Sequence, residues 1–479
     1  MLIRPLLAAA AIVLAGCAMG PEFRRPAAPA AEYYTAGGQP EETAAAGGEA
    51  GAAQHFVRGG ELPGRWWESF RCEALNALVA DALAHSPTAR QARARLREAQ
   101  EDLAAQGGAT LYPSVDAQLG ATRERVNPAA FGFSSVPPAP PFNLYNAQVN
   151  VTYPLDLLGA NRRLLEGARA QAEYQAYETE AAQLNLAANV VAAAIRQADL
   201  EAQVEYTGQI IAAGSRQLAI GEQRYAAGGL ALEDLDTERR ELEQLRATLP
   251  QLAAQRQEVD HLLAVYSGQA PSAAAIPRLR LSDLYLPTEV PVTLPSELVR
   301  RRPDVRASEA LWHQASANVG VATASLFPHL TLSASAGSER SQASQLVDGT
   351  NVWSVAASLL QPIFHGGELH ARKRSAAAAY DAAAAAYEQT VLESLQQVAD
   401  SLRVVEADAL TLRSRALAAE QAAATRAIAQ QRFDAGGISE FSLLDAERQQ
   451  LQSGLDRSRA ESQRLADTAA LMHALNGSL

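Results

Sequence analysis

The residue types and spacing closest to a metal site occur at His365 and His370, which flank Gly366 and Gly367 with Glu368 between them. Imidazole and carboxylate groups bind zinc and copper, but such sites usually take three or more ligands from the protein. The sequence lacks a His-Glu-x-x-His motif, a phosphate-binding loop and a Gly-x-Ser-x-Gly motif. We therefore expect these histidines to be polar turn residues, and we expect no enzyme activity, no catalytic residue, no metal and no cofactor-binding residue.

A different kind of chemistry is available at Cys17, which ends the leader MLIRPLLAAAAIVLAGC. The apolar run at residues 6–14 is too short to span a bilayer and is typical of a cleaved export signal. The last four residues of the leader look like a bacterial lipobox, in which the cysteine becomes the first mature residue and carries acyl chains. We expect a lipoprotein signal peptide at residues 1–16 and a covalent lipid on Cys17, with an ordinary secretory signal as the alternative. Lipoproteins of this type that stay at the inner membrane usually have aspartate after the cysteine, so Ala18 favours the outer membrane.

Three carboxylates, those of Asp234, Asp236 and Asp445, follow short turns that contain glycine. Carboxylates in such positions either pair with charges on neighbouring helices or are favoured at a helix start by the helix dipole. The sequence leaves both roles open. The second cysteine of the chain, Cys72, has no partner motif, so we expect it to be a small packed residue.

The composition restricts the classes of function. The 479 residues carry a net charge of −12, which argues against nucleic-acid binding as the main task. Residues of the apolar class make up 48% of the chain, many of them alanine, and aromatic residues make up 6%. This balance is typical of long, closely packed helices. After the leader, no apolar run is long enough to cross a bilayer as a helix.

The elements that position these residues occur twice. Residues 223–230 (QRYAAGGL) recur as residues 431–438 (QRFDAGGI), and residues 111–113 (LYP) recur as residues 326–328 (LFP), in the same order. A repeat of this length is a whole module of helices and strands rather than a solenoid unit. We expect four segments, which are the signal peptide 1–16, an acylated tether 17–65, a first repeat 66–290 and a second repeat 291–479.

Long helices dominate both repeats. Residues 160–227 contain no proline and predict about 100 Å of helix, and residues 369–435 match them. Each long helix ends at a glycine pair and is followed by a return helix, at residues 232–266 and up to residue 475. Apolar residues step by four and three along both long helices, which predicts supercoiled helix packing. These residues are Leu184, Ala188, Val191, Ile195, Ala198 and Ala202 in the first helix and Val391, Leu395, Val398, Leu402, Val405, Ala409 and Leu412 in the second.

Four short segments alternate apolar and polar residues, at 115–121, 147–153, 330–336 and 353–359. Their pattern and length suit tilted β-strands that cross a membrane. Four strands cannot close around a lumen, and open strand edges are not tolerated in lipid, so other copies of the chain would have to complete a barrel. Three copies would supply twelve strands, enough to enclose a water-filled pore. The alternative is a soluble four-stranded sheet packed on helices.

Proline and glycine predict the remaining boundaries. We expect a helix at residues 73–107 that is kinked or broken near Pro87 and stopped by Gly107 and Gly108, and a further helix at residues 296–325. Irregular chain is expected at residues 18–62, 127–143, 268–295 and 338–350.

The most specific sequence lies in the second repeat. Residues 298–310 (LVRRRPDVRASEA), running on through 317–320 (ANVG) to 327–328 (FP), closely resemble the outer-membrane efflux factors. These are the TolC- and OprM-like exit ducts of tripartite pumps, and the similarity is greatest to their lipoprotein branch. Residues 432–436 and 443–446 also look like the turn between helices in that family. The resemblance covers essentially the whole mature chain.

The resemblance implies a mostly α-helical homotrimer with a twelve-stranded outer-membrane β-barrel that is continued by a twelve-helix periplasmic α-barrel. Such a protein is the lipid-anchored exit duct of the bacterial outer membrane and extends into the periplasm. Drugs or other toxic small molecules pass through it passively from a periplasmic adaptor protein and an inner-membrane RND-type transporter. The alternatives are the exit duct of a type I protein secretion machine and a structural envelope lipoprotein.

The resemblance also assigns roles to the two glycine turns. It implies adaptor docking at Arg224, Tyr225, Gly228 and Gly229 in the first repeat and at Arg432, Phe433, Gly436 and Gly437 in the second. The same glycines would cap the helices by adopting positive φ. A gate that closes the periplasmic end would use Asp445, with Asp234 or Asp236 and Arg432 as partners, whereas Ser442 stands where some relatives have a second aspartate.

Overall fold

The computed structural model of the chain describes residues 18–476 apart from residues 39, 61, 126, 129–131, 133–134, 136 and 138–139. It consists of two compact units. Unit 1 comprises the chain up to Arg25 together with Leu96–Gln175 and Ser308–Tyr387. Unit 2 comprises Pro26–Arg95, Ala176–Ala307 and the chain from Glu388 onward.

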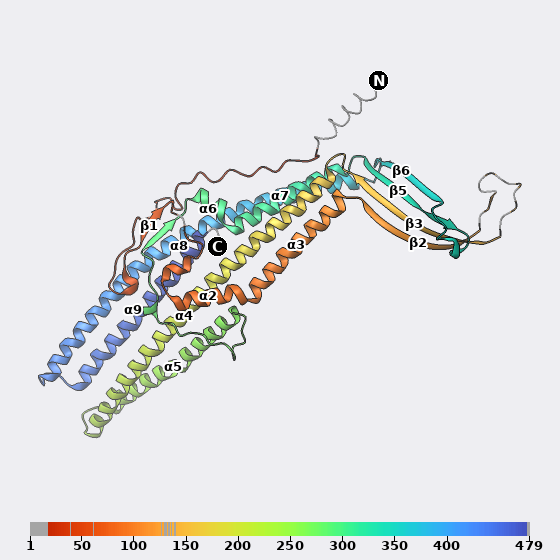
Figure 1. Ribbon diagram of the computed structural model, residues 1–479. Helices are drawn as coiled ribbons and strands as arrows, with labels where there is room; N and C mark the ends of the chain where they lie inside the picture. The colour runs from red at the N-terminus through yellow and green to blue at the C-terminus, as the bar shows by residue number, and fades with distance from the viewer. Residues whose placement is uncertain are drawn as a thin grey trace. The chain divides into compact units, whose positions relative to one another are not determined.

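The element order repeats once along the chain, as labelled in Figure 1. Each copy has a short strand, two helices, two long strands, a long helix and a return helix. The first copy contains β1 (His55–Arg58), α2 (Glu73–His85), α3 (Pro87–Leu111), β2 (Ser114–Glu124), β3 (Phe142–Leu155), α4 (Ala160–Ala226) and α5 (Leu232–Tyr266). The second contains β4 (Glu289–Val292), α6 (Pro295–Arg301), α7 (Pro303–Ala324), β5 (His329–Arg340), β6 (Val352–Leu360), α8 (Glu368–Asp434) and α9 (Glu440–Leu475). Four 3₁₀ turns complete the described elements, at Glu49–Gly51, Trp66–Phe70, Leu281–Asp283 and Ala343–Gln345.

The two copies match closely in length. Both α4 and α8 have 67 residues, while α5 has 35 and α9 has 36. The internal duplication predicted from the sequence is therefore present in the fold. The strands β1 and β4 pair in parallel at the head of each copy, ahead of the starts expected at residues 66 and 291. Among the described residues, no helix is long and apolar enough to cross a membrane.

Unit 1 contains an antiparallel sheet of four strands in the order β2-β3-β5-β6, which lie side by side in Figure 1. The register aligns the apolar residues of all four strands. For example, Val151 pairs with Val115 on one side and with Ala334 on the other, and Ala334 pairs with Val355. One face of the sheet is therefore apolar and exposed in the single chain.

The opposite face of the sheet is polar. Asn150 lies between Asp116 of β2 and Ser335 of β5, and its side chain donates a hydrogen bond of 3.3 Å to the side chain of Gln118, two residues along β2 from Asp116. The hydroxyl groups of Ser335 and Ser354 are 2.8 Å apart. The alternation predicted from the sequence is confirmed. Strands β2 and β6 form the two edges of the described sheet, so each leaves one side without a strand partner in the chain.

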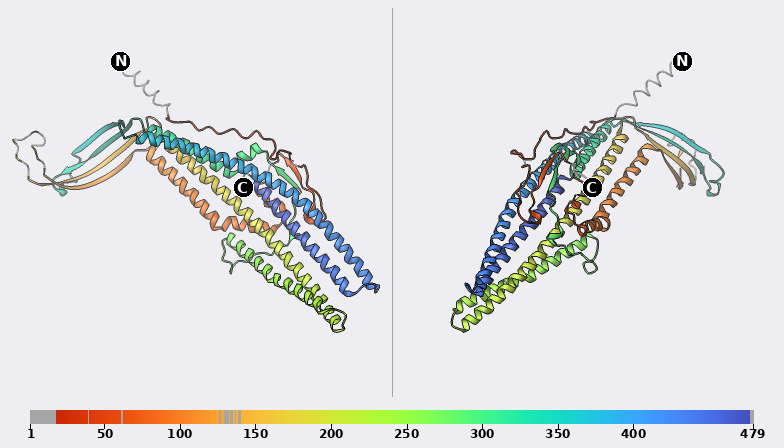
Figure 2. Two further views of the ribbon diagram at one scale, coloured as in Figure 1. Left: turned by 180° about the vertical axis from the view of Figure 1, so that it is seen from behind. Right: turned by 60° about the vertical axis from the view of Figure 1, so that its left-hand side comes forward.

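Unit 2 is built from paired helices, in which α4 returns as α5 and α8 returns as α9 (Figure 2). The heptad residues predicted from the sequence form the packed seams. In α8 the side chains of Val398, Val405 and Leu412 are fully buried, and in α4 those of Val191 and Ile195 are buried as well. Small alanines between these residues allow the helices to approach closely.

A hydrophobic core includes the segment before α2. Trp66 and Phe70 are fully buried and pack with residues of α4 and α9. Cys72, the residue before α2, is buried in the same cluster as a free thiol, as predicted. Its small side chain fills space between larger apolar groups.

The charged motif of the second repeat has a structural role in unit 2. Arg302 separates α6 from α7 and binds the Asp304 carboxylate with two hydrogen bonds, of 3.0 and 2.7 Å. It also donates to the backbone carbonyl oxygens of Ser394 in α8 and Ala474 in α9, and to the side chain of Gln397. One guanidinium therefore joins the α6–α7 junction to both helices of the second hairpin.

Several predicted boundaries were wrong. Helix α3 passes through Gly107 and Gly108 and ends at Leu111, because glycine is tolerated in a helix whereas Pro113 requires extended chain before it. Strand β3 starts at Phe142, inside the stretch 127–143 that was expected to be irregular. Strand β5 extends to Arg340, inside the expected irregular stretch 338–350, because it continues to pair with β3 up to that residue. The helix expected at residues 296–325 is interrupted at Arg302 by the following proline.

The stretch expected to be an irregular tether contains β1. Phe56 of this strand packs with Val290 and Val292 of β4, which lies in the expected linker 268–295. Nearby, the fully buried Arg464 of α9 donates hydrogen bonds to the backbone oxygens of Ala50 and Ala52. Short strands of this kind lack an alternating pattern long enough to be recognised in the sequence, and the prediction of irregular chain was wrong here.

The stability of unit 2 is expected to depend on pH through Asp408, a carboxyl group that interacts with Arg464. Burial, together with the hydrogen bond and charge of the neighbouring Asp467, raises the pKa of the Asp408 carboxyl to about 7, while Arg464 opposes the rise. Because this pKa exceeds the unfolded value near 4, the stability that Asp408 contributes is complete below about pH 4 and is lost as the pH rises through about 7. We expect Asp408→Asn to raise the thermal midpoint at pH 8 and to leave it nearly unchanged at pH 4, as measured by intrinsic fluorescence in detergent. The exposed Asp400→Asn on the same helix is the control and should show no such pH-dependent difference.

Candidate functional site: the paired helix turns

The two glycine turns of unit 2 have the same backbone structure. Gly228 and Gly436 adopt positive φ values of 74° and 72°, where a side chain would be strained. At the first turn, the Gly228 amide donates to the Tyr225 carbonyl and the Gly229 amide donates to the Arg224 carbonyl. These two bonds define a Schellman cap, which satisfies the last carbonyl groups of α4.

The second turn repeats this cap residue for residue. The Gly436 amide donates to the carbonyl of Phe433 at 2.9 Å, and the Gly437 amide donates to that of Arg432 at 2.7 Å. The capping role predicted for the glycines is thus present at both turns. The side chains of Arg224, Tyr225 and Arg432 are left exposed, and that of Phe433 is half-buried.

The starts of the return helices differ between the two turns. Helix α9 is capped by Ser439, whose hydroxyl accepts a hydrogen bond from the Ser442 amide. Helix α5 follows Ala231, which offers no side-chain cap. The hydroxyl groups of Ser439 and Ser442 are also 3.1 Å apart, so the Ser442 side chain lies against the cap of α9.

Contacts join the two hairpins of one chain near these turns. The guanidinium of Arg224 lies 5.7 Å from the ring centre of Phe441 on α9. Farther along, Arg216 of α4 forms an ion pair of 2.8 Å with Glu447 of α9. The first hairpin is therefore tied to the second through polar and aromatic groups at its surface.

The three carboxylates singled out in the sequence do not meet. Asp236 pairs with Arg239 on its own helix at 3.3 Å, and Asp445 accepts a hydrogen bond of 2.8 Å from Gln449 on its own helix. Asp234 lies in the first turn of α5, where the helix dipole favours a negative charge. Among the described residues, no hydrogen bond or ion pair joins Asp445 to Asp234, Asp236 or Arg432. In the single chain, Asp234 therefore occupies a helix start, whereas Asp236 and Asp445 lie beyond the first turn and interact within their own helices.

Asp445 nevertheless faces the other hairpin. It lines a hollow of about 440 Å³ together with Glu241 and Gln244 of α5 and Arg448 of α9. Arg448 donates a hydrogen bond to Gln217 of α4 and lies 3.9 Å from the Glu241 carboxylate. This arginine was not singled out in the sequence, because charged residues on the exposed side of a long helix are common and its partners lie more than 200 residues away.

Glu238 is a second polar residue that the sequence did not reveal. One of its carboxylate oxygens is buried without a hydrogen-bond partner in the described chain. Partial burial raises the pKa of the Glu238 carboxyl, while Arg224 and Arg448 oppose the rise. Charges from both hairpins therefore converge on this residue, just inside the turns.

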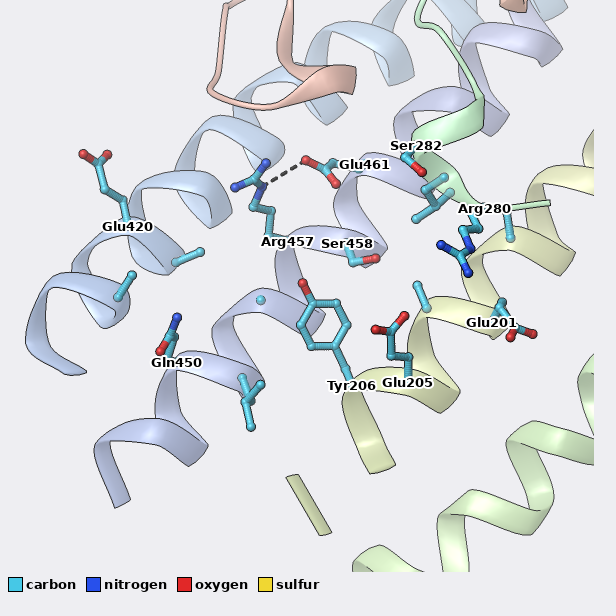
Figure 3. Close-up of a pocket in the computed structure, with 17 residues that line it drawn as sticks. Glu201, Glu205, Tyr206, Arg280, Ser282, Glu420, Gln450, Arg457, Ser458 and Glu461 are labelled. Atoms are coloured by element: carbon cyan, nitrogen blue, oxygen red, sulfur yellow. Dashed lines mark hydrogen bonds and ion pairs between the residues drawn. The ribbon is translucent and has the colours of Figure 1, made fainter. Parts of the chain in front are cut away.

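A further cavity lies farther from the turns, among α4, α8, α9 and residues 280–282 (Figure 3). Its volume is about 670 Å³. Arg457 and Glu461 form an ion pair of 2.9 Å at one side, and Glu201 pairs with Arg256 at 2.7 Å. Three of the charged residues that line this hollow thus have ion-pair partners, one of which, Arg256, lies outside the lining.

The histidine pair lies at the turn into α8. Gly366 and Gly367 both have positive φ, and the Glu368 amide donates to the His365 carbonyl. In the part of the chain that the structure describes, no group of three or more His, Cys, Asp or Glu side chains is arranged to hold a metal ion. Cys17, the expected site of the lipid, lies outside the described residues.

These features agree with the comparisons to known proteins. The family described as outer membrane efflux protein matches residues 78–269 and 294–477, which are the two copies of the repeated module. The chain therefore belongs to the outer membrane efflux protein family. The resemblance first seen in residues 298–310 is confirmed.

Individual relatives span nearly the whole chain. Outer membrane protein OprJ of Pseudomonas aeruginosa is 29% identical over 98% of this chain and 94% of its own length. The toluene efflux pump outer membrane protein TtgC of Pseudomonas putida is 30% identical over 76% of this chain and 72% of its own length. The solved outer-membrane channel OprN is 29% identical, with a TM-score of 0.81 over 96% of this chain and 99% of that chain.

Fold, family and relatives together define the role of the chain. The fold is mostly helical and similar to that of solved outer-membrane channels. The protein is an outer-membrane exit duct of an efflux system and acts at the bacterial outer membrane and in the periplasm. The function and location predicted from the sequence are confirmed at this level.

Proposed function

We propose that three copies of the chain form one passive duct, with a twelve-stranded β-barrel in the outer membrane and a twelve-helix barrel in the periplasm. The observation that carries this proposal is the four-stranded sheet with one apolar face, one polar face and two edge strands. In lipid, both edges must be paired, and copies of the same sheet provide the matching edges. The apolar face would contact lipid, and the polar face would line the pore.

The dimensions of the strands support this assembly. Strand β2 has 11 residues and β5 has 12, which is the length of tilted strands in outer-membrane barrels. A barrel of twelve strands is wide enough to hold water and small solutes. The duct itself would perform no chemistry.

The proposed partners are a periplasmic adaptor protein and an inner-membrane RND-type transporter. Several relatives are named for efflux pumps, and two of these for toluene efflux, which favours small toxic molecules as the substrate class. The exposed side chains at the two Schellman turns, Arg224, Tyr225 and Arg432, would form the docking surface for the adaptor. The exit duct of a type I protein secretion machine is the second candidate, since it would use the same fold.

Efflux from cells tests this proposal. In a strain that lacks this protein, accumulation of a fluorescent pump substrate should rise, and a plasmid copy of the gene should restore export. Restored secretion of a protein cargo, with no change in dye accumulation, would instead support the type I machine.

The segment after the leader supports a lipid on Cys17. The Met19 amide donates a hydrogen bond of 2.9 Å to the Leu158 carbonyl, and Arg163 donates to the Met19 carbonyl. Ala18 lies close to Gly159: a Cβ atom added to Gly159 would stand only 2.6 Å from the Cα atom of Ala18. The chain is thus held at the turn between β3 and α4, so a lipid on the preceding residue would start near the helix-side end of the apolar face.

Replacing Cys17 tests the anchor. We expect Cys17→Ser to abolish labelling by a radioactive fatty acid and cleavage by the lipoprotein peptidase, because the acceptor thiol is gone. Dye export should fall only in part, because the strands still insert. Labelling that persists in the variant would place the lipid elsewhere and contradict the assignment.

A gate at the turns would use charges that the trimer brings together. Asp445 faces a hollow toward the first hairpin, while Asp234 and Asp236 lie at the start of α5. Each exposed pair would contribute only about 0.2–1 kcal/mol, but three-fold symmetry repeats the contact. An adaptor that binds the open state more tightly would shift the balance by its differential affinity.

We expect the double variant Asp445→Ala with Asp234→Ala to raise single-channel conductance in planar bilayers at an unchanged yield of assembled protein. Loss of carboxylates would remove contacts that favour the closed state. Glu440→Ala removes the acid in the first turn of α9; this variant is the control and should conduct like the parent. Parental conductance in the double variant would leave these acids as helix-start residues.

A further inference from the structure

Charge is segregated between the two faces of the sheet in unit 1. On the apolar face, the only charged residues among the described strand positions are Arg123 of β2 and Arg340 of β5. On the polar face, the acidic residues are Asp116, Glu124 and Glu339. Basic and acidic side chains therefore project from opposite faces, although Arg123 and Glu124 are neighbours in sequence, as are Glu339 and Arg340.

Both arginines lie at the same end of the sheet. Strands β2 and β5 begin next to helices α3 and α7, and Arg123 and Arg340 are at their far ends. Under the proposed assembly, on which this inference rests, the far ends reach the outer leaflet. The two guanidinium groups would then be at the height of lipid headgroups, on the side of the sheet that faces lipid.

The two arginines stand on either side of β3. Arg340 pairs with Tyr145, and Arg123 pairs with Asn143, which lies two residues before Tyr145 on β3. Two strand spacings and one step of two residues separate their Cα atoms by about 12 Å. The Asn143 amide and the Tyr145 hydroxyl, 3.5 Å apart, lie between them and add neutral hydrogen-bonding groups.

Among the described residues, the two arginines have few hydrogen-bond partners. Arg123 is exposed, and Arg340 is half-buried and donates a long hydrogen bond of 3.4 Å to the backbone oxygen of Glu339. A cation on a lipid-facing surface is costly unless it reaches an anionic partner at the interface. Guanidinium groups bind phosphate with two parallel hydrogen bonds, which ammonium groups cannot do.

We propose that Arg123, Arg340, Tyr145 and Asn143 form an outer-leaflet binding site for a lipid headgroup that carries phosphate. The arginines bind the phosphate groups, and the tyrosine and asparagine bind hydroxyl groups of the same headgroup. The acids on the opposite face repel this lipid from the pore side, which fixes the face on which it binds. The occupant is thus an anionic phospholipid or glycolipid of the outer leaflet and not the transported solute.

Native mass spectrometry of the full protein in detergent tests this site. The probe is diphosphorylated lipid A, compared with enzymatically dephosphorylated lipid A and with inorganic pyrophosphate. We expect the assembled parent to retain the diphosphorylated form, and the double variant Arg123→Gln with Arg340→Gln to bind it about tenfold to thirtyfold more weakly. Replacement of both residues by lysine should give intermediate affinity, because the charge remains but the bidentate geometry is lost.

The control removes two exposed arginines from helices of unit 1, Arg97→Gln with Arg169→Gln, and should bind like the parent. Equal lipid retention by parent and glutamine variant, with both assembled, would overturn the site while leaving the proposed duct intact. Pyrophosphate binding as tight as that of lipid A would also overturn it, because a lipid would then not be required. Failure of the parent itself to assemble would instead count against the proposed trimer.

Discussion

Placing an arginine at Val355 is expected to prevent insertion of the protein into the outer membrane. Val355 is 75% exposed on the apolar face of β6, near the middle of the strand. A cation at the bilayer midplane on the lipid side of a strand costs about 2–4 kcal/mol, and three copies would repeat the cost. We expect Val355→Arg to lower the amount of assembled protein in outer-membrane fractions more than tenfold, as measured by immunoblotting of unboiled samples.

The adjacent residue supplies the control. Ser354 belongs to the polar face, where its hydroxyl contacts that of Ser335 on β5. Ser354→Arg should assemble at the parental level and change only the conductance of the pore, because water can solvate the new charge. Equal loss of assembly in both variants would contradict the assignment of the two faces.

Removal of the Arg302 side chain is expected to cause the largest loss of stability in unit 2. Only 11% of this side chain is exposed, and its hydrogen bonds satisfy the carboxylate of Asp304 and the backbone oxygens of Ser394 and Ala474. The Asp304 side chain is 42% exposed, so the main loss comes from the buried backbone oxygens of Ser394 and Ala474, at about 1–3 kcal/mol for each group left without this donor. Arg302→Ala should therefore lower the thermal midpoint strongly and expose α8 and α9 to limited proteolysis.

The same motif provides a matched comparison. Arg300 is exposed at the end of α6, two residues before Arg302. We expect Arg300→Ala to change stability by less than about 0.5 kcal/mol, as is usual for surface positions. If both variants were equally unstable, the loss would reflect the positive charge of the motif rather than the contacts of Arg302.

Much of the fold could be predicted because periodicity is a local signal. The alternation in residues 353–359 predicted both the strand and its exposed apolar side, and the spacing from Val391 to Leu412 predicted the seam of α8. The glycine pairs predicted the ends of α4 and α8, since a Schellman cap needs a positive φ at one position. These features depend on residues close together in sequence.

Features that depend on distant residues could not be predicted. Strand β1 is four residues long and is held in position by pairing with β4, which lies more than 200 residues away in the sequence. Arg448 and Glu238 are ordinary surface charges until α4, α5 and α9 are packed together. The acids Asp234, Asp236 and Asp445 were found as residue types, but nothing in the sequence gives their distances from the neighbouring copies that a gate requires.

The central claim is that three copies of this chain complete one pore. Native mass spectrometry of the full-length protein, extracted in mild detergent, measures the number of chains in the assembly directly. We expect a single dominant species with three times the mass of the mature acylated chain, stable to moderate collisional activation. A dominant monomer or dimer under the same conditions would contradict the shared barrel.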